Sequence, residues 1–149
     1  ASMHNPCITP GTAEQHTNAY LKVMDNPKVC VLGHTETADY PYDYDAVTKA
    51  CREKNVAMEF NVSRFRSQTS IQRLHDIILP TCAKNGCYVM VNSDAHFCSK
   101  IGAFKKAEAL LKDIGFPEEL IVNADLERFE NFLKSKGIKT NAEIEPDED

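Results

Sequence analysis

The residues best suited to chemistry in this sequence are Asp94 and His96, which directly follow an apolar run in the segment VNSDAHF. His4 and His34 also stand at the ends of short strand-like segments. Carboxylates and imidazoles are common protein ligands of zinc, iron and manganese. The carboxyl ends of parallel strands lie on one face of a βα fold, so these side chains are expected to converge there. The spacing therefore predicts a divalent metal site formed by His4, His34, Asp94 and His96.

Two other interpretations of these residues stay open. The same side chains could form a hydrogen-bonded polar network under a loop, without a metal. A Ser-His-Asp triad is less favoured, because the sequence contains no G-x-S-x-G segment or similar nucleophile turn. In a metal site, Asp94 and His96 would serve mainly as ligands, with catalytic acid or base duty as the lesser role.

Further polar residues lie in and after the segment VAMEFNV, which is otherwise suited to burial. A buried carboxylate needs partners, so Glu59 either orients a metal ligand or faces outward. Asn61, Arg64 and Arg66 follow and are candidate substrate-binding residues. Guanidinium groups beside a metal site suit an oxyanion such as phosphate, although either arginine alone would equally suit a solvated basic loop.

Strand-like and helix-like segments alternate at intervals of about thirty residues, which predicts βα units and an α/β fold. The run at 1–3 reads as the end of a strand. The other predicted strands cover residues 29–33, 56–62, 87–92 and, more briefly, 120–122. Most of them read as buried on both faces, as in a parallel sheet covered by helices. About four parallel strands with covering helices make either a small open sheet or half a barrel.

The segments between these strands have helical periodicity. Thr12 to Gln15 has the pattern of a capping box at the start of the first helix, and Asp43 or Asp45 can cap the second. Pro80 should kink or split the third helix. The predicted helices cover approximately residues 12–25, 43–55, 68–85, 101–114 and 125–136.

Composition narrows the class of protein. The chain has 149 residues, 42% of them hydrophobic, which is typical of one globular domain. The net charge of -5 disfavours nucleic acid as the main partner. No apolar run reaches the roughly 18 residues of a membrane span, and no signal peptide opens the chain, so a cytoplasmic, reducing setting is expected. The six cysteines are then expected to be reduced, and Cys82 with Cys87 lacks the second pair that a zinc site needs.

Several segments resemble, in the same order, motifs of the PHP-domain metal-dependent hydrolases. They are GH at Gly33-His34, YPYDYDAV at 40–47, VAMEFNVS at 56–63, VNSDAHF at 91–97 and FPEELIVNADLERFENFLKSKG at 116–137. The sequence is most similar to the YcdX-type phosphatase subgroup, over nearly the whole chain. The strand-end GH and the SDAH segment together carry this resemblance, since either alone would be weak.

The resemblance implies a distorted (βα)7 TIM-like barrel that hydrolyses phosphoesters. It implies up to three divalent metal ions in the complete domain, as zinc, iron or manganese. His4 and His34 would share one of these ions, and Asp94 and His96 would bind the others. The implied substrate is a small phosphorylated molecule, and binding to nucleic acid or a membrane is not expected.

The resemblance also covers only part of the family's pattern. The opening H-x-H motif and the glutamate that bridges metals have no counterpart, so residues 1–137 would be the C-terminal part of a PHP domain, half of the barrel. Residues 138–149 would be a flexible acidic tail. Such a fragment would have an incomplete metal site and little activity. The loop TETADYP after His34 and the pair Asn61-Val62 also depart from the family, which leaves substrate choice open.

Other functions stay open beside this one. The chain could be a non-catalytic metal- or phosphate-binding fragment that packs with the missing N-terminal half or forms a homo-oligomer. It could carry out another reaction of the same superfamily, such as histidinol-phosphate hydrolysis or nuclease cleavage. It could also be a metal-free open α/β sheet that holds a phosphorylated ligand.

Overall fold

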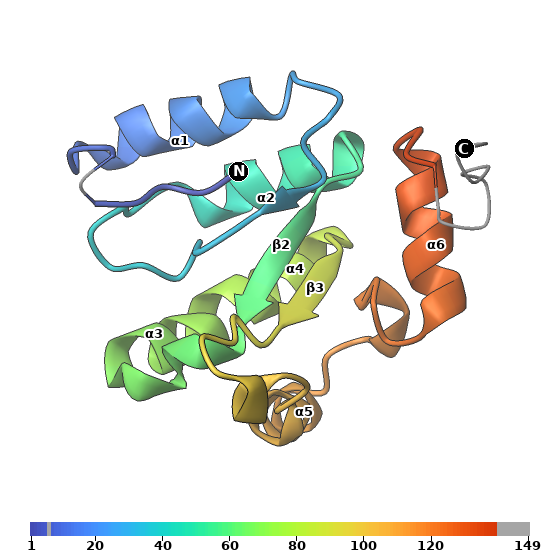
Figure 1. Ribbon diagram of the computed structural model, residues 1–149. Coiled ribbons are helices and arrows are strands. Elements are labelled where there is room, and N and C mark those ends of the chain that lie inside the picture. Colours follow the sequence, from blue (N-terminus) through green and yellow to red (C-terminus); the bar gives the residue numbers. More distant parts are fainter. Residues whose placement is uncertain (6, 140–149) are drawn as a thin grey trace, which may run out of the picture.

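The computed structural model describes residues 1–5 and 7–139, and the predicted acidic tail lies, from residue 140 on, outside the described residues. A parallel sheet lies at the centre, with the strand order β1-β2-β3. The strands are β1 (Val31–Leu32), β2 (Ala57–Asn61) and β3 (Val89–Asn92). The register pairs Val31 with Ala57 and Asn61 with Asn92. Figure 1 shows β2 and β3 side by side with their arrowheads in the same direction.

Helices connect and cover these strands (Figure 1). They are α1 (Ala13–Val23), α2 (Tyr44–Glu53), α3 (Gln68–Arg73), α4 (Leu79–Asn85), α5 (Lys105–Asp113) and α6 (Leu126–Ser135). Short 3-10 turns are η1 (Val62–Arg66), η3 (Cys98–Lys100) and η4 (Glu118–Leu120).

Local sequence signals account for most of the helix ends. The capping box of Thr12 and Gln15 is confirmed at the start of α1. Asp43 caps α2 by accepting the backbone N–H of Ala46 at 3.0 Å, whereas Asp45 lies in the first turn. Before α5 the prediction was wrong by one turn. Gly102 adopts a φ of 73°, so the chain cannot be helical there and α5 begins only at Lys105.

The helix predicted over 68–85 is split, as Pro80 indicated. It continues through a π-helical turn, η2 (Leu74–Ile78), before α4 begins. Pro80 stands in the first turn of α4, where its missing N–H leaves the carbonyl of Asp76 without its usual helical donor. A local widening of the helix to the π form is a known response to such an interruption.

Alternation along β2 gives the sheet two different faces. Met58 and Phe60 belong to the larger apolar core, together with residues of α1, α2, α4 and α5. Ala57 belongs to a smaller core with Met90, Val122 and Phe132 of α6. Because side chains alternate along a strand, Glu59 and Asn61 share the face of Ala57. That face is therefore apolar at the start of β2 and polar at its end.

The predicted half of a (βα)7 barrel with about four strands is wrong, because the sheet is three-stranded and open. The two flanking segments that were predicted as strands form single bridges instead. Ser2 bridges to Gly33 beside β1, and Ile121 bridges to Val89 beside β3. Neither contact extends into a ladder, so the α/β class is right and the barrel architecture is not.

Asn123 explains why pairing stops beside β3. Its side-chain oxygen accepts the backbone N–H of Val91 at 2.9 Å, and its amide nitrogen donates to the Val91 carbonyl at 2.7 Å. The Asn123 side chain thus occupies the N–H and the carbonyl of Val91, which a longer fourth strand would otherwise have bonded. This arrangement ends the sheet and also protects the exposed edge of β3.

All six cysteines are free thiols. Cys82 and Cys87 are fully buried in the larger apolar core, which suits small hydrophobic side chains rather than half of a zinc site. Across residues 1–5 and 7–139, no helix combines the length and apolar character that crossing a membrane requires.

Replacing Asn123 tests this account of the sheet edge. Asn123→Ala removes both hydrogen bonds to Val91, so we expect it to lower the free energy of unfolding by about 1–3 kcal/mol. The measurement is urea denaturation followed by circular dichroism. The matched control is Asn18→Ala on the exposed surface of α1, which should change stability by less than about 0.5 kcal/mol. Equal stabilities of the two variants would contradict the proposed edge cap.

Candidate functional site

The polar end of β2 meets residues from the ends of β1 and β3. Glu59 accepts a hydrogen bond from the Asn92 amide at 3.0 Å and another from the backbone N–H of His34 at 2.9 Å. Glu59 therefore faces the site and fixes the chain just after β1, which decides between its two predicted orientations. The preceding Gly33 leaves room for this contact, since a Cβ there would lie 3.3 Å from a Glu59 oxygen.

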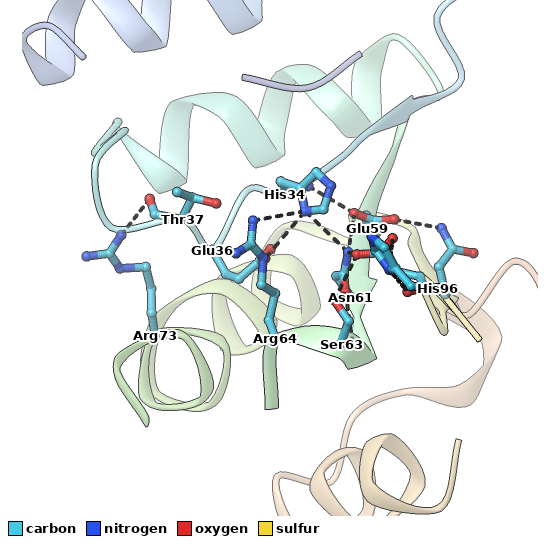
Figure 2. A network of polar contacts seen from close by, with 11 residues as sticks. His34, Glu36, Thr37, Glu59, Asn61, Ser63, Arg64, Arg73 and His96 are labelled. Atoms are coloured by element: carbon cyan, nitrogen blue, oxygen red, sulfur yellow. Dashed lines mark hydrogen bonds and ion pairs between the residues drawn. The ribbon is translucent and has the colours of Figure 1, made fainter. Parts of the chain in front are cut away.

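The fully buried amide of Asn61 lies at the centre of the site (Figure 2). Its nitrogen is 3.1 Å from Asp94 Oδ2, 3.3 Å from His34 Nδ1 and 3.4 Å from Glu59 Oε2. Its oxygen accepts a hydrogen bond from the backbone N–H of Ser63 at 2.9 Å and lies 2.7 Å from the Ser63 hydroxyl oxygen. One side chain thus joins residues that follow each of the three strands.

Asp94 is held as an ionised carboxylate. Its Oδ2 accepts hydrogen bonds from the Ser63 hydroxyl at 2.8 Å and from Asn61. Burial raises the pKa of Asp94, but the two hydrogen bonds together with the nearby His34 and His96 outweigh it and hold the pKa below its usual value. An ionised carboxylate is the form that binds a cation.

Two non-glycine residues of the site have left-handed backbone conformations. His34 has a φ of 55° and Asp94 a φ of 46°. Such conformations cost free energy and persist only where surrounding contacts enforce them, often at functional sites. Here Glu59 holds the backbone of His34, while Asn61 and Ser63 hold the side chain of Asp94.

His34 and His4 are neighbours, as the sequence predicted from their strand-end positions. Their ring centroids are 4.4 Å apart with an interplanar angle of 78°. Burial lowers the pKa of His34, the Glu59 carboxylate partly opposes this effect, and Arg64 adds to it. The neutral imidazole is the form that binds metals. His4 is exposed beside it.

His96 lies next to Asp94 but is not brought into contact with the other histidines. Its Nδ1 is 2.9 Å from the Asp94 backbone carbonyl and 3.8 Å from the Asp94 carboxylate. The side chain is 83% exposed. The structure therefore brings together His4, His34 and Asp94, and leaves the His96 ring at the surface.

The two candidate arginines differ. Arg64, on the 3-10 turn after β2, has Nη2 3.4 Å from His34 Nδ1. Its Nε lies 3.1 Å from a carboxylate oxygen of Glu36. The Arg66 side chain lies outside the described part of the structure, so its predicted role in substrate binding is untested.

Glu36 is the site residue that sequence reasoning missed. It is completely buried, and one carboxylate oxygen lies 3.9 Å from His34 Nδ1. Burial raises the pKa of Glu36 to about 7, against the opposing effects of a backbone N–H and of Arg64. A sequence signal existed in the loop TETADYP, because a carboxylate stands two residues after a strand-end histidine and shortly before the buried Tyr40 and Tyr42.

The donor types of this site fit zinc, iron or manganese. His4, His34 and Asp94 offer two imidazoles and a carboxylate at adjacent strand ends. In the part of the chain that the structure describes, no three His, Cys, Asp or Glu residues already form a cluster that could hold a metal ion. The Asn61 amide lies between His34 and Asp94, so these two side chains are positioned by hydrogen bonds from the protein.

Proteins named "Probable phosphatase" are similar to this chain: one from Clostridium novyi is 42% identical over 139 residues, and one from Clostridium botulinum is 40% identical over 137 residues. Another, from Clostridium acetobutylicum, is 39% identical over 150 residues. No protein-family model matches the chain.

These matches cover 92%, 92% and 97% of the chain. The chain spans only 57%, 56% and 60% of the length of these relatives. The similarity therefore relates this chain to part of each of these proteins.

Asn61→Asp tests the arrangement around the central amide. The new carboxylate would lie against Glu59 and Asp94, so we expect a loss of roughly 2 kcal/mol or more in the free energy of unfolding at pH 7. Repulsion raises the pKa of this cluster in the folded state. The loss should therefore be largest above that raised pKa and should shrink as pH falls toward 5.

The measurement is urea denaturation at both pH values, with a chelator present to exclude metal binding. Asn18→Asp on α1 is the matched control, because it adds the same charge at an exposed position. Asn61→Asp that is no less stable than the control, or a loss that grows as pH falls, would contradict the arrangement.

Proposed function

We propose that this chain contributes to a metal-dependent phosphoesterase that hydrolyses a small phosphorylated substrate, in the manner of the PHP-domain hydrolases. One observation carries the proposal. His34 lies beside His4 and is joined to Asp94 through the Asn61 amide at the ends of parallel strands, in a chain about 40% identical to proteins named as phosphatases. Zinc, iron or manganese is the proposed cofactor, since imidazole and carboxylate donors suit these ions.

The ligand set proposed for this chain is His4, His34, Asp94 and His96. His96 belongs to it by its position next to Asp94, and its exposed ring is free of packing that would prevent rotation toward the site. Because the relatives are considerably longer than the matched region, we propose that further ligands come from protein outside this chain. A homo-oligomer or a separate segment could supply them.

The residues of this chain would prepare the site for cations. When bound, divalent cations supply positive charge that polarises phosphoryl oxygens and lowers the pKa of water toward neutrality. Ser63 and Asn61 keep Asp94 ionised and directed toward the site. Asp94 and His96 are the proposed catalytic residues, mainly as ligands.

Substrate recognition would use the basic side of the site. Arg64 presents Nη2 beside His34, where a phosphate held by metal would lie, and guanidinium groups bind phosphate oxygens by paired hydrogen bonds. Arg66 is a second proposed contact. Asn61 uses its amide in contacts with the protein, so we assign it the positioning of His34 and Asp94 in place of its predicted direct contact with substrate.

Hydrolysis of p-nitrophenyl phosphate with Mn²⁺ or Zn²⁺ tests the proposal. The assay compares the chain with a version extended to the length of the relatives. We expect the extended protein to be active, and His34→Ala or Asp94→Asn to lower kcat/KM by roughly 100-fold through loss of a ligand. Calorimetric titration with Zn²⁺ should show correspondingly weaker binding.

His75→Ala is the matched control, because His75 is partly exposed on η2 and contacts Asp76 and Asp113. It should retain activity and zinc binding. Undiminished activity and zinc binding in both site variants would refute the proposed ligands. An extended protein that binds zinc but hydrolyses no phosphoester would instead favour a non-catalytic binding role.

A further inference from the structure

The buried polar atoms without a hydrogen-bond partner are concentrated in one place among the described residues. The side-chain oxygens of Thr35, Glu36 and Thr37 are all unpartnered, and so are the Tyr42 hydroxyl and Arg64 Nε. More than nine in ten buried polar groups in proteins have a partner, so such a concentration calls for an explanation. The segment lies directly after His34, at the proposed metal site, and this points to a function there.

Glu36 and Arg64 form the charged pair of this region. Arg64 Nε is 3.1 Å from Glu36 Oε1, close enough for strong attraction although the N–H is not aligned for a hydrogen bond. The Glu36 side chain is 0% exposed, whereas that of Arg64 is 36% exposed. The carboxylate therefore lies behind the guanidinium, away from solvent. An isolated buried carboxylate is unfavourable, so the positive charge of Arg64 stabilises it there.

The orientation of Arg64 follows from this pair. Glu36 contacts the inner nitrogen Nε, which leaves the outer nitrogens free to face the site, and Nη2 lies 3.4 Å from His34 Nδ1 (Figure 2). A free arginine side chain has many rotamers, and fixing it before a ligand arrives removes an entropic cost from binding. Glu36 thus preorganises the guanidinium.

A second arginine fastens the backbone of the loop that carries Glu36. Arg73 of α3 donates a hydrogen bond from Nη1 to the Thr37 backbone carbonyl at 3.0 Å. Figure 2 shows Arg73 and Arg64 reaching the loop from the same helical side of the structure. Glu36 is therefore held by its own backbone rather than by Arg64 alone, as a positioning residue must be.

We propose that Glu36 is a positioning residue that holds Arg64 ready to bind the phosphate group of a phosphomonoester beside His34. The proposal rests on the proposed function and adds a substrate class to it, because a terminal phosphate offers oxygens that match the fork of the guanidinium. Glu36 acts only through Arg64 and touches no substrate atom.

A double-mutant cycle on inorganic phosphate binding tests this directly. Isothermal titration calorimetry, on the protein extended to the relatives' length with Mn²⁺ present, compares the wild type with E36Q, R64Q and the double variant. Loss of a charge-assisted contact should weaken phosphate binding roughly 10-fold or more in R64Q. Because Glu36 acts through Arg64, E36Q should also weaken binding, and the double variant should bind no more weakly than R64Q.

Two controls separate positioning from a general loss of structure. Glu53→Gln, at an exposed position on α2, should leave phosphate binding unchanged. Thermal unfolding is recorded for each variant, and Glu36→Asp, which keeps the charge, should restore part of the affinity that E36Q loses. If E36Q does not fold, Glu36→Asp in the wild-type and R64Q backgrounds gives the same cycle.

The outcomes are distinct from those of the proposed function. Wild-type affinity in E36Q, losses that multiply in the double variant, or no phosphate binding by the wild type would each overturn the positioning role, even if hydrolysis is observed. Coupled losses in phosphate binding without hydrolysis of p-nitrophenyl phosphate would support the positioning role and refute the phosphoesterase proposal.

Discussion

The site depends on one buried side-chain amide, that of Asn61. Asn61 is the last residue of the central strand, and its nitrogen meets His34 after β1 and Asp94 after β3. An amide is neutral and donates hydrogen bonds, so it can lie between an imidazole and two carboxylates without adding charge. The Ser63 hydroxyl also helps to hold these side chains, because it lies within hydrogen-bond distance of both Asn61 and Asp94. Together these contacts hold two residues in strained backbone conformations.

The two-faced sheet explains why this polar cluster can exist beside a packed interior. Met58 and Phe60 anchor β2 in the larger core, and Ala57 packs with residues of the smaller one. Glu59 and Asn61 share the face of Ala57 but lie nearer the carboxyl end, where the strands give way to loops. The same strand therefore supplies both the rigidity and the functional groups, and rigid elements hold a site more precisely than loops do.

Much of this could be predicted from sequence. Strand-end positions placed His4, His34 and Asp94 together, because parallel strands end at one edge. The sequence shows that Glu59 and Asn61 alternate with apolar residues. Their contacts, however, depend on the left-handed backbone conformation of His34, which the sequence does not favour at a non-glycine residue. Burial of Glu36 depends on how the loop packs with Tyr40 and Tyr42, a tertiary effect. The barrel prediction failed because Asn123, an ordinary loop residue in the sequence, replaces a strand partner through its side chain.

We propose that Asn61 positions His34 and Asp94 to bind the same cluster of cations. The most direct measurement is a crystal structure of the protein soaked in Mn²⁺ or Zn²⁺, with the metal located by anomalous scattering. We expect a peak within roughly 2.0–2.2 Å of a His34 nitrogen or an Asp94 oxygen, with the Asn61 amide still contacting at least one of them. Metal peaks found only elsewhere, or His34 and Asp94 separated from Asn61, would contradict it.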